Sequence, residues 1–325
     1  MKKFLAIILA VVLMLSLSVV ALADDEEFED VSTITITKTF TDVNGGVSPA
    51  ETFSFSDFET VEILENDAAE FPETLPTIDD VSFDEGEATA SKTATITLPE
   101  YDAVGIYVYS FTEEAGNTAG VTYNSDTFYL VVTVIEQDGK VRVAAVHCEG
   151  GYEAGTYGEE PKTDEFENTY ESGTLEVTKA VTGKLGDKTK YFEVTVTFTP
   201  ADGEVINSTI TYSGGQYAQD VTVENNTATF QVKDSDTITF TNIPEGVTWE
   251  VEEADYSNDG YDTTYDAATG TIAAGDADTC TITNDKDTTP DTGITLDSLP
   301  YILIGMVVLA AAVAMILNKR RNNAF

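Results

Sequence analysis

The sequence is poor in the side chains on which most enzyme chemistry depends. It has a single histidine, His147, and two cysteines, Cys148 and Cys280, among 325 residues. The sequence also has no CxxC pair and no HExxH motif. It therefore has almost none of the side chains that metal catalysis or Ser-His-Asp catalysis requires. A hydrolase could draw only on scattered Asp and Glu residues. We therefore expect no cofactor, no metal site and no enzyme that acts on an external substrate.

Positive charge is also scarce, because 16 Lys and Arg residues stand against 58 Asp and Glu residues. Such an excess of acid argues against binding nucleic acid or an anionic membrane surface. The chain has no complete EF-hand loop that would gather oxygen ligands for calcium. The acids are therefore expected to form a solvated surface, which keeps an exposed protein soluble and separate from its neighbours.

The N-terminus has the layout of a secretory signal. Lys2 and Lys3 precede a nearly unbroken apolar stretch over residues 4–20, and Ala21-Leu22-Ala23 offers small residues where a signal peptidase cuts. This order predicts a signal peptide over residues 1–23 and an exported protein. The alternative is an uncleaved membrane anchor, because the apolar stretch is longer than a minimal signal core.

A second apolar segment lies near the C-terminus. Residues 299–317 form an uncharged stretch that is long enough to span a bilayer. Lys319, Arg320 and Arg321 follow it directly. The segment is preceded by Thr-Pro-Asp-Thr-Gly at residues 289–293. This tripartite layout resembles the cell-wall sorting signal read by sortases, although a Thr stands where Leu is the commonest residue. The resemblance implies cleavage between Thr292 and Gly293, and a simple single-pass membrane anchor is the alternative.

The predicted mature product, residues 24–292, retains 11 of the 16 basic residues and 57 of the 58 acidic residues, a net charge of −46. Its length suggests two domains. The two cysteines fall in different halves, so we expect no disulfide within a domain, and an exported protein of this size must then be stabilised in another way.

The body of the chain reads as short β-strands, with alternating apolar residues and frequent β-branched and aromatic side chains. The clearest runs are residues 33–40, 93–98, 106–111, 128–134, 175–179, 192–198, 249–253 and 279–284. This texture predicts an all-β protein of two tandem β-sandwich domains, over residues 27–170 and 174–286, with a spacer, sorting motif, membrane segment and basic tail over residues 287–325. Only residues 61–71 suggest a short helix.

Both predicted domains carry the same three polar residues in the same order. In the first domain Lys38 stands on the first strand, Glu113 follows an aromatic strand, and Asn168 stands on the last strand. In a strand, alternate side chains point to the same face, and each of the three shares its parity with apolar neighbours. All three are therefore expected to point into the core.

The second domain repeats the pattern with Lys179, Glu253 and Asn284. Burial raises the pKa of a carboxylic acid and lowers that of an amine. A neutral lysine amine is a nucleophile, and a protonated acid can polarise an asparagine amide and shuttle protons. The expected product is a Lys–Asn isopeptide bond with loss of ammonia. The alternative for each triplet is an exposed pair of strand residues or a salt bridge.

The motifs around these residues resemble the backbone pilins of streptococci, of the T-antigen type. The resemblance rests on residues 105–113, 120–123 and 166–168 in the first half, and on residues 175–183, 249–256 and 281–284 in the second. It implies Ig-like domains in which Lys38–Asn168 and Lys179–Asn284 bonds form, promoted by Glu113 and Glu253. The neighbouring acids Glu114 and Glu252 are expected on the opposite face.

The resemblance also implies a structural subunit of a sortase-assembled pilus. Its expected partners are a sortase, other copies of itself joined head to tail, peptidoglycan, and a host ligand that the sequence does not specify. Lys162 is the candidate acceptor of the next subunit's Thr, with Lys184, Lys188 and Lys190 as alternatives. The competing function is a monomeric wall-anchored adhesin or stalk protein.

Overall fold

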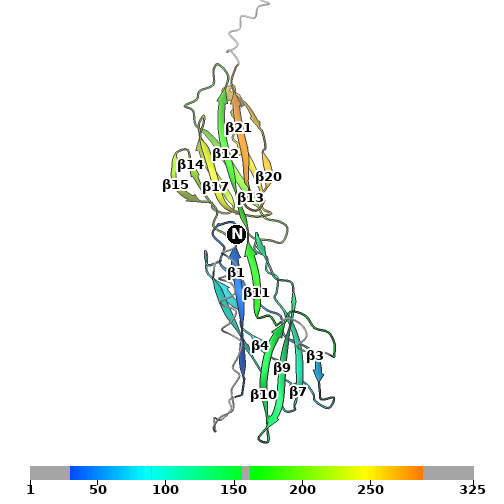
Figure 1. The fold of residues 1–325 in the computed structure, drawn as a ribbon. Coiled ribbons are helices and arrows are strands. Elements are labelled where there is room, and N and C mark those ends of the chain that lie inside the picture. The colour runs from blue at the N-terminus through cyan, green and yellow to red at the C-terminus, as the bar shows by residue number, and fades with distance from the viewer. Residues whose placement is uncertain (1–29, 89, 156–161, 288–325) are drawn as a thin grey trace, which may run out of the picture.

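The structure consists almost entirely of β-strands. The computed structural model describes residues 30–88, 90–155 and 162–287, and in that part of the chain the only helical element is a 3-10 turn, η2 (Ser257–Asp259). Figure 1 shows the strands gathered into two sandwiches stacked end to end. We call residues 33–170 the N-terminal sandwich and residues 172–285 the C-terminal sandwich. The predicted all-β architecture is confirmed.

The N-terminal sandwich contains eleven strands. They are β1 (Thr33–Asp42), β2 (Glu51–Phe53), β3 (Glu59–Leu64), β4 (Thr77–Ile78), β5 (Val81–Phe83), β6 (Ser91–Thr97), β7 (Gly105–Thr112), β8 (Val121–Thr122), β9 (Thr127–Gln137), β10 (Lys140–Glu149) and β11 (Glu165–Tyr170). One sheet has the order β4-β6-β1-β11-β8 and the facing sheet has the order β10-β9-β7-β3. A two-stranded ribbon, β2-β5, completes the unit.

The C-terminal sandwich contains ten strands. They are β12 (Ser172–Thr182), β13 (Phe192–Thr199), β14 (Thr211–Gly214), β15 (Tyr217–Thr222), β16 (Thr227–Val232), β17 (Thr237–Pro244), β18 (Thr248–Glu253), β19 (Asp262–Tyr265), β20 (Thr269–Thr271) and β21 (Ala277–Asp285). A six-stranded sheet in the order β15-β14-β17-β12-β21-β19 faces a four-stranded sheet in the order β16-β13-β18-β20.

In each sandwich the first and last strands are neighbours and run parallel. β1 pairs with β11, and β12 pairs with β21. Parallel neighbours cannot be joined by a tight hairpin, so the whole of each sandwich lies between them in the chain. The start and the end of each unit therefore meet inside one sheet, and Figure 1 shows β11 leading directly into β12.

Period-two alternation builds each core and places polar groups inside it. In β1 the inward positions carry Ile36, Lys38 and Phe40, and all three are fully buried. Phe40 packs edge-to-face with Phe53 and Phe83, with ring centroids 5.2 and 5.6 Å away. The aromatic core thus surrounds a lysine, which is unusual because lysine is almost never fully buried without a partner.

The expectation of a helix over residues 61–71 is wrong. Residues 59–64 form β3, which pairs antiparallel with β7 at the edge of the four-stranded sheet. Glu65 then has a φ of +66°, which a right-handed helix cannot contain. The backbone groups of this segment are satisfied by the neighbouring strand, and pairing of this kind depends on residues over forty positions away.

Both cysteines are buried free thiols. Burial raises the pKa of Cys148 and of Cys280 to about 12. Since the thiolate is the reactive form, neither side chain is prepared for chemistry at neutral pH. Cys280 fills a small inward position beside Ile282 on β21, as the alternation predicts.

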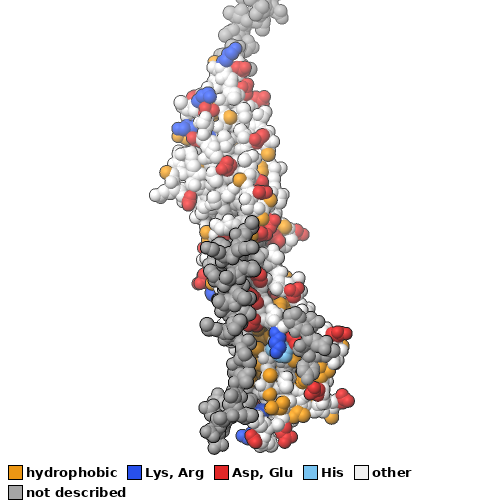
Figure 2. Space-filling model, in the orientation of Figure 1, with side chains coloured by type: hydrophobic (Ala, Val, Ile, Leu, Met, Phe, Trp, Pro, Cys, Tyr) orange, Lys and Arg blue, Asp and Glu red, His pale blue; other side chains and the backbone are white. Residues whose placement is uncertain are grey.

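The predicted signal peptide, sorting motif and C-terminal membrane segment lie outside the described residues. Within the described ranges, no helix has the length and hydrophobicity to cross a membrane. On the visible face of both sandwiches acidic side chains are widely spread and basic ones are few (Figure 2), as expected for a solvated acidic surface.

The packing of Trp249 against Gly270 gives a test of the C-terminal core. The two residues are cross-strand partners on β18 and β20, and a Cβ at Gly270 would lie 2.5 Å from the indole ring. Gly270→Ala should therefore lower the free energy of unfolding by about 1–3 kcal/mol, the usual cost of overpacking. Urea unfolding followed by Trp fluorescence measures it. The exposed neighbour provides a control, since Thr271→Ala should change stability by no more than about 0.5 kcal/mol.

Candidate isopeptide sites

The three predicted residues of the N-terminal sandwich meet in its core. Lys38 Nζ lies 2.7 Å from Glu113 Oε2 and also donates a hydrogen bond to Asn168 Oδ1. Asn168 Nδ2 in turn donates to Glu113 Oε1. The side chains of Lys38 and Glu113 are both fully buried. The carboxylate therefore spans the two nitrogen atoms between which a proton would have to move.

The sheet register explains this meeting. Lys38 lies opposite Phe166 in the β1–β11 pair, and Asn168 lies two positions further along β11, opposite Phe40. Both side chains point to the same face because they stand on inward positions of adjacent strands. Glu113 comes from the facing sheet, directly after β7, where it forms a bridge with Phe55.

The C-terminal sandwich repeats the arrangement. Lys179 lies opposite Ile282, and Asn284 is again two positions further along the last strand. Glu253, the last residue of β18, approaches from the facing sheet. Its Oε2 is 2.9 Å from Lys179 Nζ, an ion pair without hydrogen-bond alignment, and Asn284 Nδ2 donates to its Oε1 at 2.6 Å.

The two sites differ at the asparagine carbonyl. Asn168 Oδ1 accepts a hydrogen bond from the backbone N–H of Asn124, at 3.2 Å, in addition to that from Lys38. Asn284 Oδ1 is buried and accepts no hydrogen bond from the described residues. A donor on this oxygen polarises the carbonyl and stabilises the charge that develops when an amine attacks its carbon. The N-terminal site is therefore the better prepared of the two.

Burial shifts both lysines toward the neutral form. Desolvation lowers the pKa of Lys38 and of Lys179, and the adjacent glutamates oppose that shift only in part. Each ammonium also lies over an aromatic ring, Phe53 at 4.3 Å and Phe192 at 4.6 Å from the ring centroids. These apolar covers keep water from the amine.

The sequence did not reveal the aromatic covers or the Asn124 donor. Phe53 stands 15 positions after Lys38, and Phe192 stands 13 positions after Lys179. Because these spacings differ by two positions, an alignment of the two halves on their lysines does not bring the two phenylalanines into register. The Asn124 contact has no signal in the sequence either, because it depends on how the loop after β8 closes over the site.

The exposed-strand alternative for the triplets is wrong for this structure, since all six side chains are buried. A buried salt bridge remains the ground state from which any reaction would start. The neighbouring acids Glu114 and Glu252 are exposed, on the face predicted for them. Within the described residues, no group of three His, Cys, Asp or Glu side chains is placed to hold a metal ion.

Lys162 is exposed and pairs through a backbone bridge with Glu149, at the end of β10. It lies apart from both triads, next to the start of β11. Of the alternatives, Lys188 is 3.1 Å from Asp234 and Lys190 is 2.5 Å from Asp259, whereas Lys184 is exposed and forms no ion pair among the described residues. Thr292 and Gly293 lie outside the described residues.

Both halves of the chain match models of known protein families. Residues 34–171 match a family model described as a Spy0128-like isopeptide containing domain, and residues 173–286 match one described as a domain of unknown function. A pilin of Streptococcus pyogenes serotype M1 is 29% identical over 252 residues, which covers 70% of this chain and 72% of that pilin.

Two further relatives show how far the likeness extends. The crystal structure of the major pilin from Streptococcus pyogenes superposes with a TM-score of 0.56 at 26% identity, over 79% of this chain and 99% of that one. The pilus tip adhesin Cpa of Streptococcus pyogenes is 32% identical over 128 residues, but these cover only 18% of the adhesin. The resemblance to streptococcal backbone pilins that the motifs predicted is confirmed.

The intact mass of residues 24–292 tests the chemistry of the triads. We expect the mass to fall short of the calculated value by two ammonia molecules, one for each Lys–Asn bond. Glu113→Ala and Glu253→Ala should each restore one ammonia, because the proton carrier between the two nitrogens is lost. The exposed neighbours supply matched controls: Glu114→Ala and Glu252→Ala should keep both deficits. A wild-type mass without any deficit would exclude the reaction.

Unfolding measurements test what each bond contributes. Asn168→Ala removes the electrophile but leaves the Lys38–Glu113 ion pair in place. The bond would close a loop between positions 130 apart, so its loss should lower the stability of the N-terminal sandwich by about 4 to 5 kcal/mol, by analogy with disulfides. Calorimetry should show that transition shifted downward alone, whereas Asn284→Ala should shift the other one. Unchanged transitions in both variants would contradict a stabilising role.

Proposed function

We propose that this relative of the streptococcal major pilins is the repeating structural subunit of a covalent surface pilus, stabilised by bonds that it forms within itself. The observation that carries the proposal is the pair of buried Lys–Glu–Asn triads, each between the first and last strands of a sandwich. The family to which the chain is related is structural, so the chemistry we assign is a single intramolecular turnover in each triad.

The reaction would begin with the transfer of a proton from the lysine ammonium to the glutamate. In the N-terminal site the freed Lys38 amine attacks Cγ of Asn168, and the Asn124 N–H stabilises the developing negative charge on Oδ1. Glu113 passes its proton to Nδ2, with which it already shares a hydrogen bond, and takes back the proton released by the new amide nitrogen. The Cγ–Nδ2 bond breaks, ammonia leaves, and a Lys–Asn isopeptide bond remains.

Assembly would require a sortase, which cuts between Thr292 and Gly293 and transfers the Thr carbonyl to a lysine of the next subunit. Lys162 is the proposed acceptor. It is exposed, and its ammonium has no carboxylate partner among the described residues, which is also true of Lys184, whereas Lys188 and Lys190 form ion pairs. A backbone bridge to Glu149 and a hydrogen bond from the Thr163 N–H to the Cys148 carbonyl, at 3.1 Å, fix its place on the sandwich.

The route of tension through such a fibre follows from the strand order. Force applied at Lys162 enters β11, passes into β12, and can leave through β21 by way of the proposed Lys179–Asn284 bond. That bond would bypass most of the C-terminal sandwich, so its hydrogen-bonded ladders would not have to resist extension. The Lys38–Asn168 bond has a different part, because it would fasten β11 to the body of the N-terminal sandwich.

The relatives are pilus proteins of the cell surface, and we place this chain there. Export by the signal peptide, transient membrane anchoring by residues 299–317 and final attachment to peptidoglycan are parts of the same proposal. A monomeric wall-anchored adhesin is the competing function. Its support is the match to a tip adhesin, and that match covers 18% of the adhesin.

Substitution of the acceptor separates the two functions. In the native cell with its sortase, Lys162→Arg should abolish the ladder of high-molecular-weight species on a denaturing gel, because a guanidinium keeps the charge but does not attack an acyl-enzyme. Lys140→Arg, at an exposed hairpin lysine, is the matched control and should leave the ladder intact. A ladder that persists in the Lys162 variant would reassign the acceptor, and the absence of any ladder in the wild type would favour the adhesin.

A further inference from the structure

The junction between the sandwiches contains an asparagine in an unusual backbone conformation. Asn242 lies near the end of β17, is 8% exposed, and has a φ of +60°. A residue other than glycine adopts this conformation at a cost in free energy, and it persists only when surrounding contacts hold it. The contacts around Asn242 must therefore stabilise its positive φ.

A β-bulge creates the conformation. Along the β12–β17 pair, Gly173 lies opposite Ile243 but Leu175 lies opposite Phe240, so two residues of β17 stand against one of β12. A bulge of this kind turns a side chain away from its regular direction. Here the bulge includes Asn242, and its side chain is directed toward the N-terminal sandwich.

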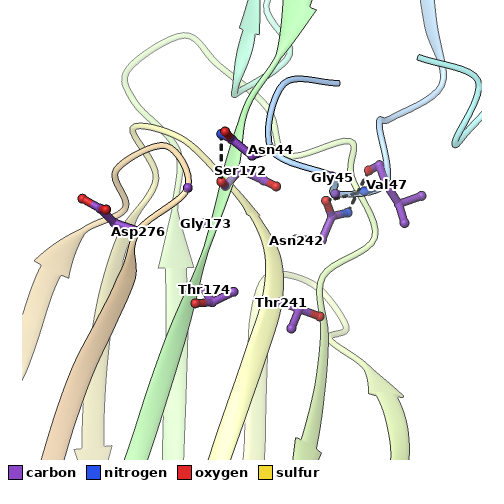
Figure 3. Close-up of a pocket in the computed structure, with 11 residues that line it drawn as sticks. Asn44, Gly45, Val47, Ser172, Gly173, Thr174, Thr241, Asn242 and Asp276 are labelled. Atoms are coloured by element: carbon purple, nitrogen blue, oxygen red, sulfur yellow. Dashed lines mark hydrogen bonds between the residues drawn. The ribbon is translucent and has the colours of Figure 1, made fainter. Parts of the chain in front are cut away.

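The Asn242 side chain pairs with the backbone of a residue in the other sandwich. Val47 N donates to Asn242 Oδ1 at 2.9 Å, and Asn242 Nδ2 donates to Val47 O at 2.9 Å (Figure 3). The amide thus imitates a strand residue that pairs with Val47. Nδ2 also donates to Thr209 O at 3.0 Å, and the Tyr170 hydroxyl donates to Oδ1 at 3.3 Å, so both ends of the side chain are fully used.

The loop that carries Val47 is itself fixed to the N-terminal sandwich. It follows β1, and the Asp42 carboxylate accepts hydrogen bonds from the N–H groups of Asn44 and Gly45, each at 3.0 Å. Asn44 also reaches Ser172 O across the junction, at 3.4 Å. The approach is close: a Cβ on Gly46 would lie 2.7 Å from Asn242 Oδ1 and 2.5 Å from the Ser172 hydroxyl.

The covalent chain crosses the junction once, from β11 into β12, and a single strand crossing can act as a hinge. The Val47 pairing adds a second crossing beside it, from the loop after β1 to β17, and β1 and β17 are the neighbours of β11 and β12. A third set of contacts lies on the loop after β7, where the Ala119 N–H donates to Val205 O and the Val205 N–H donates to Asn117 O, each at 2.9 Å, and Asn207 Nδ2 donates to Thr118 Oγ1 at 2.8 Å.

We propose that Asn242 is a latch that fixes the orientation of the two sandwiches and makes the molecule a stiff rod. Asparagine suits the position because it tolerates a positive φ and supplies both a donor and an acceptor. Glycine would supply only the conformation, and aspartate would lack the donor for Val47 O. The latch is a property of the single chain, so it holds whether or not the chain is assembled into a fibre.

The test is a distance distribution across the junction, measured on residues 24–292 by electron–electron double resonance. Nitroxide labels on Asp80→Cys and Asp220→Cys, both at exposed positions, report one sandwich each, and the two native thiols are buried. The unsubstituted junction should give one narrow distribution. Asn242→Gly keeps the backbone conformation and deletes the latch, and should broaden the distribution at least twofold.

Two further variants make the result decisive. Asn225→Gly is the matched control, because Asn225 is exposed, also has a positive φ, at +51°, and lies in the loop between β15 and β16; its distribution should match that of the wild type. Gly46→Ala attacks the same contact from the N-terminal sandwich and should broaden the distribution. A folded Asn242→Gly variant with wild-type width would overturn the proposal. If that variant does not fold, a wild-type width in Gly46→Ala would overturn it.

Discussion

A lysine amine held against a glutamate carboxylate inside an apolar core is the interaction on which each sandwich depends. Two charges buried together are unfavourable unless their geometry is good and their remaining hydrogen bonds are satisfied. In the N-terminal sandwich, Lys38, Glu113 and Asn168 meet this condition by bonding to one another. The proposed reaction would also remove the problem, because an amide and a protonated acid carry no charge.

Strand topology turns this local interaction into a connection between distant parts of the chain. The lysine and the asparagine of each triad stand on the first and last strands, which are parallel neighbours. The glutamate comes from the facing sheet, so each triad also joins the two layers of its sandwich. One set of three side chains thus links both ends of a domain and both of its sheets. A structural subunit under tension gains most from a covalent bond between those two end strands.

The two levels of organisation use different chemistry. Within a sandwich the critical groups are charged, buried and reactive, whereas the junction between sandwiches relies on a neutral amide, Asn242, and on backbone pairing. The surface carries a large excess of acid and has few cations to offer. Subunits with such a charge repel one another, so a covalent link between them is a more reliable join than a charged interface.

The sequence by itself determined the all-β class, the long strands and the inward direction of the six triad side chains. Strict alternation around Lys38 and Lys179 indicated both the strands and the direction of each side chain, because a strand has only two faces. The exposure of Glu114 and Glu252 follows from the same rule. The helix expected over residues 61–71 failed because a short segment of mixed character takes its structure from the strand beside it, here β7.

Only the tertiary structure decided the strand register, the aromatic rings that cover the lysine amines, and the contacts between the two sandwiches. The offset of two positions between each lysine and its asparagine depends on how β1 pairs with β11 and β12 with β21. The Asn124 donor, the phenylalanines over the amines and the Asn242 latch depend on loops that meet across long separations in the chain. Local sequence limits which way a side chain points, but the partner it meets is fixed by the closure of the whole sandwich.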